Sequence, residues 1–175
     1  MAELRARGYA DVTMEGVAER AQTGKAALYR RWPTKQELIL DVLRTGAPDP
    51  SELTEGHDVR TALLSVLTAV NRVLAGDGGS PGIDVLAGLY RSPELREAFI
   101  DQLVNPRLAA LERILRQAVD RGEIAPTGDL RLIARTGGAL VLQGHFLGGA
   151  PLAEHQLTSI IDQIILPLLR PKPGR

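Results

Sequence analysis

The sequence predicts an all-α protein with an N-terminal three-helix head and a C-terminal helical bundle behind it. Three observations favour this fold. Apolar residues recur every three or four positions along most of the chain, which is the period of an amphipathic helix. Helix start and stop signals separate these stretches, and no alternating β pattern competes with them. The core must be mainly aliphatic, because 44% of the residues are hydrophobic but only 3% are aromatic.

The head is predicted to contain helices over about 2–8 and 13–21, a short helix after the turn at 22–24, and a helix from Thr34 to about Thr45. Gly8 is a C-terminal stop signal, and Thr13 is a suitable N-cap. Thr34 and Glu37 form a T-x-x-E capping box. The turn contains Gln22, which is less suited than glycine to a positive φ.

The body is predicted to follow a polar linker at 46–57, which contains Pro and Gly. This gives a head at 1–45, a helical domain at 58–170 and a loose tail at 171–175. Ser92 with Pro93, Asn105 with Pro106, and Asp129 are start signals for successive helices. The body helices are expected at 59–74, 83–90, 93–104, 105–121, 129–147 and 152–169.

The net charge is zero, but it is unevenly distributed. Residues 1–45 hold eight Lys or Arg and six Asp or Glu, whereas residues 46–175 hold thirteen and fifteen. From Arg20 to Lys35 there are five basic residues and no acidic one. Phosphate contacts act within about a Debye length of ~10 Å, so this local basic segment permits DNA binding.

Several other classes of protein are disfavoured. The absence of cysteine excludes disulfides and thiolate metal sites, and no apolar run approaches the roughly 20 residues of a membrane span. The histidines, at 57, 145 and 155, lack the spacing of metal ligands. The loop at 76–79 lacks the Lys-Ser/Thr of a phosphate-binding loop. We therefore expect a soluble cytoplasmic protein that is not an enzyme and needs no cofactor.

Residues 13–35 indicate a helix-turn-helix, whose second helix enters the DNA major groove. The competing interpretation is an ordinary solvated amphipathic helix. Lys25 is the expected polar reader of base edges, and Ala26 or Ala27 could contact thymine methyl groups. Arg30 and Arg31 could contact either bases or phosphates. Thr13, Tyr29 and Lys35 are expected to bind phosphates. The predicted DNA-binding residues are Thr13, Thr23, Gly24, Lys25, Ala26, Ala27, Tyr29, Arg30, Arg31 and Lys35.

The motifs RGY at 7–9, TMEGVAERA at 13–21 and KAALYRRWPTKQEL at 25–38 resemble the TetR family of bacterial transcription regulators. The resemblance implies a homodimeric repressor that binds a palindromic operator and is released by a small-molecule effector. Family members normally carry more turns before residue 2, so we expect Met1 to be an artificial or misassigned start, or the upstream turns to have been removed. The turn at 22–24 also departs from the family's usual Gly-Val-Ser. An alternative is therefore a helical small-molecule or protein-binding module whose shortened head no longer binds DNA.

The resemblance also implies a dimer interface and an effector pocket in the body. The family dimerises through its last two helices. On pattern alone, the competing interpretation is that their apolar faces form the core of a monomer. The expected interface residues are Gly137, Leu140, Val141, Gly144, Leu157, Ile160, Ile161, Ile164, Ile165 and Leu168. Polar or aromatic residues within apolar stretches are the expected pocket residues, namely Tyr90, Phe99, Gln143, His145 and Phe146. They do not identify the effector.

Overall fold

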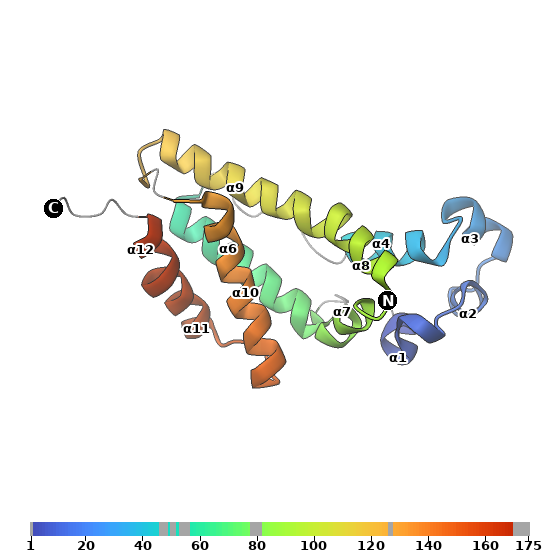
Figure 1. Ribbon diagram of the computed structural model, residues 1–175. Coiled ribbons are helices and arrows are strands. Elements are labelled where there is room, and N and C mark those ends of the chain that lie inside the picture. The colour runs from blue at the N-terminus through green and yellow to red at the C-terminus, as the bar shows by residue number, and fades with distance from the viewer. Residues whose placement is uncertain are drawn as a thin grey trace.

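The computed structural model describes residues 2–45, 49, 52, 57–77, 82–125 and 128–169, and the regular structure within these ranges is all helical. The N-terminal helices are α1 (Ala2–Asp11), α2 (Met14–Arg20), α3 (Lys25–Arg31) and α4 (Lys35–Thr45). The body consists of α6 (Val59–Ala75), α7 (Ile83–Leu89), α8 (Pro93–Phe99), η2 (Ile100–Val104), α9 (Asn105–Asp120), α10 (Leu130–Gly148), α11 (Glu154–Ser159), η3 (Ile160–Ile165) and α12 (Leu166–Leu169). The molecule is elongated, with α3 near one end and α12 near the other (Figure 1). The predicted all-α fold is confirmed. None of the described helices is long and apolar enough to cross a membrane.

Local signals explain where the head helices begin. The Thr13 hydroxyl accepts a hydrogen bond from the Gly16 N–H at 3.1 Å, and this confirms the predicted cap of α2. The Thr34 hydroxyl accepts one from the Glu37 N–H at 3.2 Å at the start of α4. In the turn between α2 and α3, Gln22 has a φ of 50°, in the left-handed region that costs a side-chain-bearing residue about 1–2 kcal/mol.

The head and the body share an apolar core. Residues of α1 and α4 and the connecting Val12 pack against residues of α7, α8 and η2. The buried members of this cluster are Leu4, Val12, Ile39, Leu40, Leu43, Val85, Leu89, Leu95 and Leu103. Most of the predicted linker and the whole predicted tail lie outside the described residues, so the division at 46–57 stays a prediction. The shared core nevertheless couples α4 mechanically to the body.

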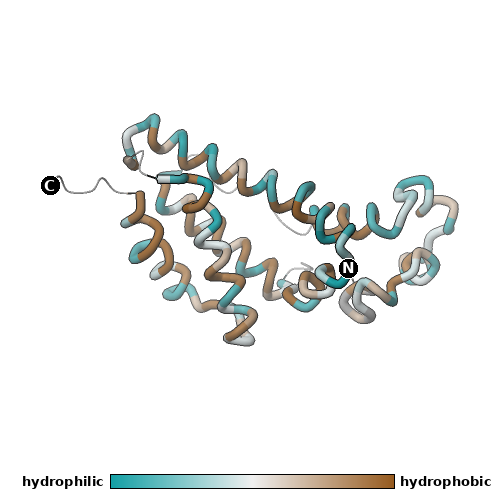
Figure 2. Tube along the Cα trace, in the orientation of Figure 1, coloured by the Kyte–Doolittle hydropathy of each residue, from teal (hydrophilic) through white to brown (hydrophobic). Residues whose placement is uncertain are grey.

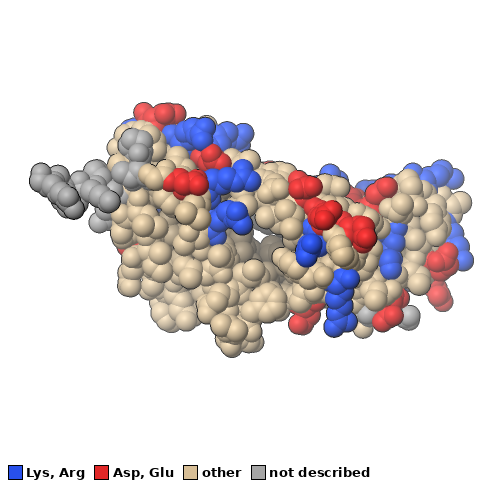
Figure 3. Space-filling view, in the orientation of Figure 1, with Lys and Arg blue, Asp and Glu red and all other residues tan. Residues whose placement is uncertain are grey.

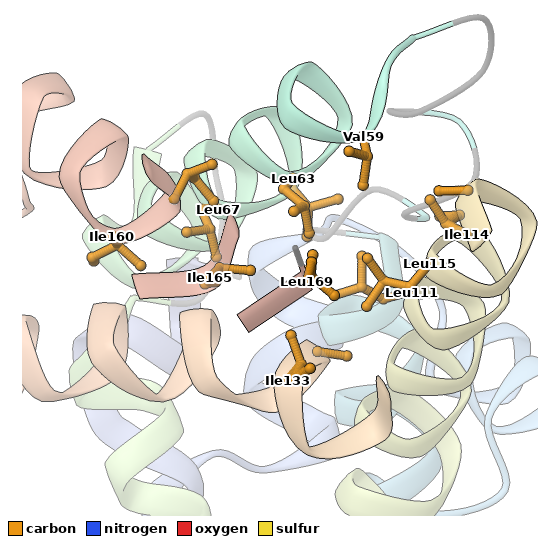
Figure 4. Packing of buried hydrophobic residues seen from close by; sticks show 14 of the residues in the cluster. Val59, Leu63, Leu67, Leu111, Ile114, Leu115, Ile133, Ile160, Ile165 and Leu169 are labelled. Atoms are coloured by element: carbon orange, nitrogen blue, oxygen red, sulfur yellow. The ribbon is translucent and has the colours of Figure 1, made fainter. Parts of the chain in front are cut away.

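A second core fills the body, where α6, α9 and α10 surround the last helices (Figure 4). Leu115 of α9 and Leu169 of α12 have no exposed surface. Apolar residues lie on the inner sides of these helices, and polar residues line the outer side of α9 (Figure 2). Asp58 and Asp129 cap α6 and α10 through bonds to backbone N–H groups, so the predicted start at Asp129 is confirmed.

Two helices contain π segments that the sequence periodicity does not predict. Residues from Pro93 to Asp120 form one continuous helix through η2, so the predicted break at Asn105 is wrong. The last helix also continues through η3 to Leu169, and it begins at Glu154 rather than at 152. Each π segment ends two residues before a proline, Pro106 or Pro167. A proline ring clashes with the carbonyl four residues earlier, and we attribute the continuity of both helices to the wider π turn, which relieves this clash.

Adjacent glycines of α10 should respond in opposite ways to alanine. A Cβ at Gly137 would lie 2.8 Å from Ile165 Cδ1 and 2.9 Å from Leu67 Cδ2, whereas a Cβ at Gly138 would meet no atom within 4 Å. We expect overpacking by Gly137→Ala to destabilise the fold by about 1–3 kcal/mol. The higher helix propensity of alanine offsets part of this cost. Gly138→Ala should stabilise it by about 0.5–1 kcal/mol. Urea unfolding at one protein concentration checks both, and shifts of the same sign would contradict the packing described here.

Candidate nucleic-acid interface and helical body

The short helix α3 is held against α2 and α4 by a small apolar cluster. Its buried members are Met14, Ala18, Leu28 and Leu38. Leu28 is the buried residue of α3, and the remaining residues of this helix are exposed. This arrangement leaves almost the whole surface of α3 available to a partner, which is the geometry that a recognition helix requires.

The predicted DNA-binding residues are almost all on the surface. Nine of the ten are exposed, and Lys35 is half-buried. Thr23 and Gly24 lie in the turn before α3, and Gly24 begins the helix without a side-chain cap. The roles assigned to individual residues stay predictions, but their exposure satisfies the first requirement for contact with DNA.

An acidic residue that the sequence analysis missed organises part of this surface. Glu15 Oε1 lies 3.9 Å from Lys25 Nζ, and it accepts a hydrogen bond from the Tyr29 hydroxyl at 3.5 Å. Glu15 therefore brings together a predicted base reader and a predicted phosphate ligand one helical turn apart. The position of Glu15 in the first turn of α2, two residues after the Thr13 cap, is the sequence feature that could have indicated this role. DNA phosphates would have to compete with this carboxylate for both side chains.

Lys35 has structural partners that the sequence analysis did not foresee. Its ammonium group donates to the carbonyl oxygens of Tyr9 at 3.0 Å and Ala10 at 3.3 Å. It also lies 4.4 Å from the centroid of the Tyr9 ring. Lys35 thus ties the start of α4 to the short turn that follows the kink of α1 at Gly8. Phosphate binding by Lys35 stays a prediction, and it would require an exchange of these partners.

Arg31 also contacts the head itself. Its guanidinium lies over the Trp32 ring at 4.5 Å, and Trp32 Nε1 donates to Asp41 Oδ2 at 3.0 Å. The hydrogen bond from Trp32, followed by that from Arg44, holds the pKa of the Asp41 carboxyl below its usual range. These contacts connect the end of α3 to α4, so a displacement of α4 would also move the end of α3.

Two family models together match nearly the whole chain. The model described as "Bacterial regulatory proteins, tetR family" matches residues 1–42, and the one described as "Tetracyclin repressor-like, C-terminal domain" matches residues 53–164. The chain belongs to the TetR family. It is a DNA-binding helix-turn-helix transcriptional regulator, as the resemblance implied.

Similar proteins agree with this assignment over nearly their full lengths. The uncharacterized HTH-type transcriptional regulator Rv1556 of Mycobacterium tuberculosis is 31% identical over 98% of this chain and 84% of its own. The DNA-binding transcriptional repressor TetR of Mycobacteroides abscessus is 30% identical over 94% of this chain and 86% of its own. The crystal structure of the TetR family regulator SCO0332 has a TM-score of 0.65 at 25% identity, covering 93% of this chain and 90% of that one.

The body of this TetR-family chain contains an apolar cavity of about 300 Å³ between α6, α9 and α10. Figure 3 shows the surface hollowed between α9 and α10. Leu43 from the last turn of α4, Phe99 of α8 and Leu103 of η2 also line it. The volume lies at the lower end of the range for small-molecule sites. Because Leu43 is part of its wall, the cavity directly adjoins the helix that connects the head to the body.

The structure does not bring the five predicted pocket residues together. Phe99 lines the cavity, but Tyr90, Gln143 and Phe146 are exposed elsewhere. His145 is buried at a different place, against Asn71. These five residues therefore do not line the cavity together, because aliphatic residues of α6, α9 and α10 make most of its wall. Periodicity cannot distinguish such wall residues from filled core.

His145 belongs to a buried polar network around Asn71. Asn71 Oδ1 accepts a hydrogen bond from the Leu152 N–H at 3.0 Å, and Asn71 Nδ2 donates to the Leu152 carbonyl at 2.9 Å. His145 Nε2 lies 2.8 Å from the same Oδ1, so with this amide orientation the imidazole acts as the donor. The network fastens the loop before α11 to α6 and α10.

This network should make stability depend on pH in the histidine range. Burial lowers the pKa of His145, and the Asn71 hydrogen bond offsets part of this effect. The unfolded chain, with a histidine pKa of about 6.5, then takes up a proton before the folded chain does. The contribution of His145 to the free energy of unfolding should be fully present above about pH 6.5. It should decrease as the pH falls toward the pKa of His145 in the folded chain. Urea unfolding at pH 7.5 and 5.5 checks this: His145→Gln should reduce the difference, whereas a control change at exposed His155 should not.

Most of the predicted dimer residues instead fill the core of the single chain. Their apolar side chains, and the backbone of the glycine, pack against α6 and one another. The buried ones are Gly137, Val141, Leu157, Ile160, Ile161 and Ile165. Leu140 and Gly144 are half-buried, and a Cβ at Gly144 would meet Leu152. The buried six lie on the inner side of their helices in the single chain, and their part in a dimer interface stays a prediction.

An exposed apolar surface nevertheless remains on the same helices. It comprises Leu132, Phe146 and Leu147 of α10, Ile164 of η3 and Leu168 of α12. Leu147 is 79% exposed and Leu132 is 63% exposed. On the face shown in Figure 3, charged side chains are scarce over α10, α11 and α12. Exposed apolar residues mark an interaction site where they form a contiguous patch. Only Ile164 and Leu168 were predicted as interface residues.

Proposed function

We propose that this protein is a ligand-responsive repressor that binds a palindromic operator as a homodimer. Residues 1–45 would serve as the DNA-binding head and residues 58–170 as the ligand-binding and dimerisation domain. Its role would be regulatory rather than catalytic, at cytoplasmic DNA. The observation that carries the proposal is the position of Leu43, which lies in the wall of the body cavity and on the helix that supports the head.

The exposed apolar surface supports the dimeric part of the proposal. One recognition helix contacts only a few base pairs, so specific regulators of this class pair two helices about 34–36 Å apart on DNA. Ile164 and Leu168 are large, exposed apolar residues. The helix α12, which carries Leu168, lies at the end of the molecule away from α3 (Figure 1). Pairing through this surface would bury it and leave both heads free to contact DNA.

The cavity and the shared core support ligand response. An occupant between α6, α9 and α10 would touch Leu43 and Leu103, which also belong to the core between head and body. A ligand acts on DNA affinity only if it favours one head position over another. Displacement of Leu43 would shift α4, and the Arg31–Trp32–Asp41 contacts would carry this shift to α3.

Selection from a random duplex library, followed by binding measurements over a salt series, tests the proposal. We expect a palindromic site, two chains per duplex and an affinity that falls steeply with salt. Binding without sequence preference, or no binding, would overturn the regulator proposal. The latter outcome would favour a helical binding module whose head does not bind DNA.

A further inference from the structure

The wall of the body cavity has an unusual composition. Of its eighteen lining residues, sixteen are apolar and two are arginines, Arg107 of α9 and Arg135 of α10. No acidic side chain is among the described residues that line it. The cavity thus combines a long apolar surface with positive charge and no lining acid, so its chemistry differs from that of a site for a neutral hydrocarbon.

Arg107 is the more deeply placed of the two arginines. It is half-buried, whereas Arg135 is exposed. Burial lowers the pKa of Arg107, and Asp49 offsets part of this effect. A cation in an apolar wall loses hydration free energy. A bound anion would compensate for more of this loss than a neutral polar group would.

The contacts of Arg107 connect the cavity to α4. Its Nη1 donates to the Leu103 carbonyl at 3.1 Å, and its Nη2 donates to the Arg44 carbonyl at 3.4 Å. The second bond is long and reaches the last turn of α4, next to Leu43. A carboxylate is a stronger acceptor than a backbone carbonyl, so an anion that reached this guanidinium would compete with the Arg44 carbonyl.

We propose that the effector is an amphiphilic carboxylate, with its apolar chain between α6, α9 and α10 and its carboxylate bound to Arg107. This inference rests on the proposed ligand-responsive function and adds the chemical class of the ligand. Arg135 assists by attracting the anion to the cavity. Binding draws Arg107 away from the end of α4, so that occupancy weakens a contact between body and head.

Three probes of equal chain length test the charge requirement on the full chain. Decanoate, decan-1-ol and decylamine carry an anionic, a neutral and a cationic head on the same apolar chain. Calorimetric titration should give an affinity for decanoate at least tenfold higher than for decan-1-ol, and weaker binding still for decylamine. Equal or tighter binding of the alcohol or the amine, or no binding of any probe, would overturn the proposal.

Two variants locate the binding site. Arg107→Gln keeps a hydrogen-bond donor but removes the charge, so it should reduce decanoate affinity about tenfold or more and leave decan-1-ol affinity nearly unchanged. The matched control is Arg113→Gln, an exposed position on the same helix that does not line the cavity. Gly138→Leu should abolish binding of the chain by filling the cavity from α10, where space is open. Thermal unfolding verifies that each variant is folded.

DNA binding, measured on the same preparations, separates the two proposals. Sequence-selective DNA binding that decanoate does not weaken would overturn the effector assignment and leave DNA recognition standing. Absence of selective DNA binding together with charge-dependent decanoate binding would overturn the regulator and leave the cavity chemistry intact. Arg107→Gln and Arg113→Gln with equal losses of decanoate affinity would place the carboxylate elsewhere.

Discussion

Replacing both Ile164 and Leu168 with aspartate should convert the protein from a dimer to a monomer and lower operator affinity by about 10²–10⁴-fold. Both side chains are large, apolar and exposed in the single chain, at 40% and 49%. In the proposed dimer the new carboxylates would be buried against apolar surface, whereas in the monomer they remain hydrated. The loss of affinity follows because each head would then bind DNA without the effective concentration that a linked second head supplies.

Sedimentation equilibrium and fluorescence anisotropy with the selected duplex measure the two effects. The control is Gln117→Asp, which adds one carboxylate at an exposed position of α9 outside this apolar surface. The control should remain dimeric and bind DNA normally. A double variant that is still dimeric would exclude this surface as the interface, and a monomer with undiminished affinity would contradict the two-headed mode of binding.

Lys25→Ala should reduce specific affinity roughly thirtyfold or more and relax base preference at two symmetrically related positions. A good base contact contributes about 1–3 kcal/mol of discrimination, and in a dimer both heads carry the change, which gives about 2–6 kcal/mol in total. Lys25 lies at the first position of α3, and its ammonium group makes an exposed contact with the Glu15 carboxylate. Repeating the duplex selection with the variant measures both the affinity and the preference.

Arg72→Ala, which removes an exposed charge from α6 in the body, is the control for general electrostatics. It should leave the selected sequence unchanged. An equal loss of affinity for all duplexes in Lys25→Ala, with a smaller salt slope, would reassign Lys25 to phosphate contact. Arg30, tested in parallel as Arg30→Ala, would then be a further candidate for base contact on the exposed face of α3.

Helix starts and the recognition motif could be predicted because they depend on residues close together in the chain. Thr13, Ser92 and Asp129 all accept hydrogen bonds from backbone N–H groups two or three residues ahead, as their positions in the sequence indicated. The unfavourable conformation of Gln22 was foreseen for the same reason, since a tight turn after α2 needs a positive φ. The basic face of α3 could also be predicted, but Ala27, which the pattern places inward with Leu28, is exposed, and Leu28 is buried.

The dimer surface and the cavity could not be predicted in the same way. Periodicity assigns Ile161, Ile164, Ile165 and Leu168 to one broad stripe, yet Ile161 and Ile165 are buried and the other two are exposed. Neighbouring positions differ by about 100° around a helix, so tertiary packing decides which edge of a broad stripe faces the core. Two hydrogen bonds could not be predicted either, because their partners are far apart in the sequence. Arg107 bonds to the Arg44 carbonyl of α4, and His145 bonds to Asn71 of α6.

The π segments also predict how homologous sequences should align. A π turn bonds each N–H to the carbonyl five residues back, so η2 and η3 each hold more residues than an α-helix of the same length would need. A homologue with an ordinary residue in place of Pro106 or Pro167 has no clash to relieve. Its helix can be shorter by one residue and still present the same faces to the core. One-residue alignment gaps should therefore occur together with the absence of these two prolines.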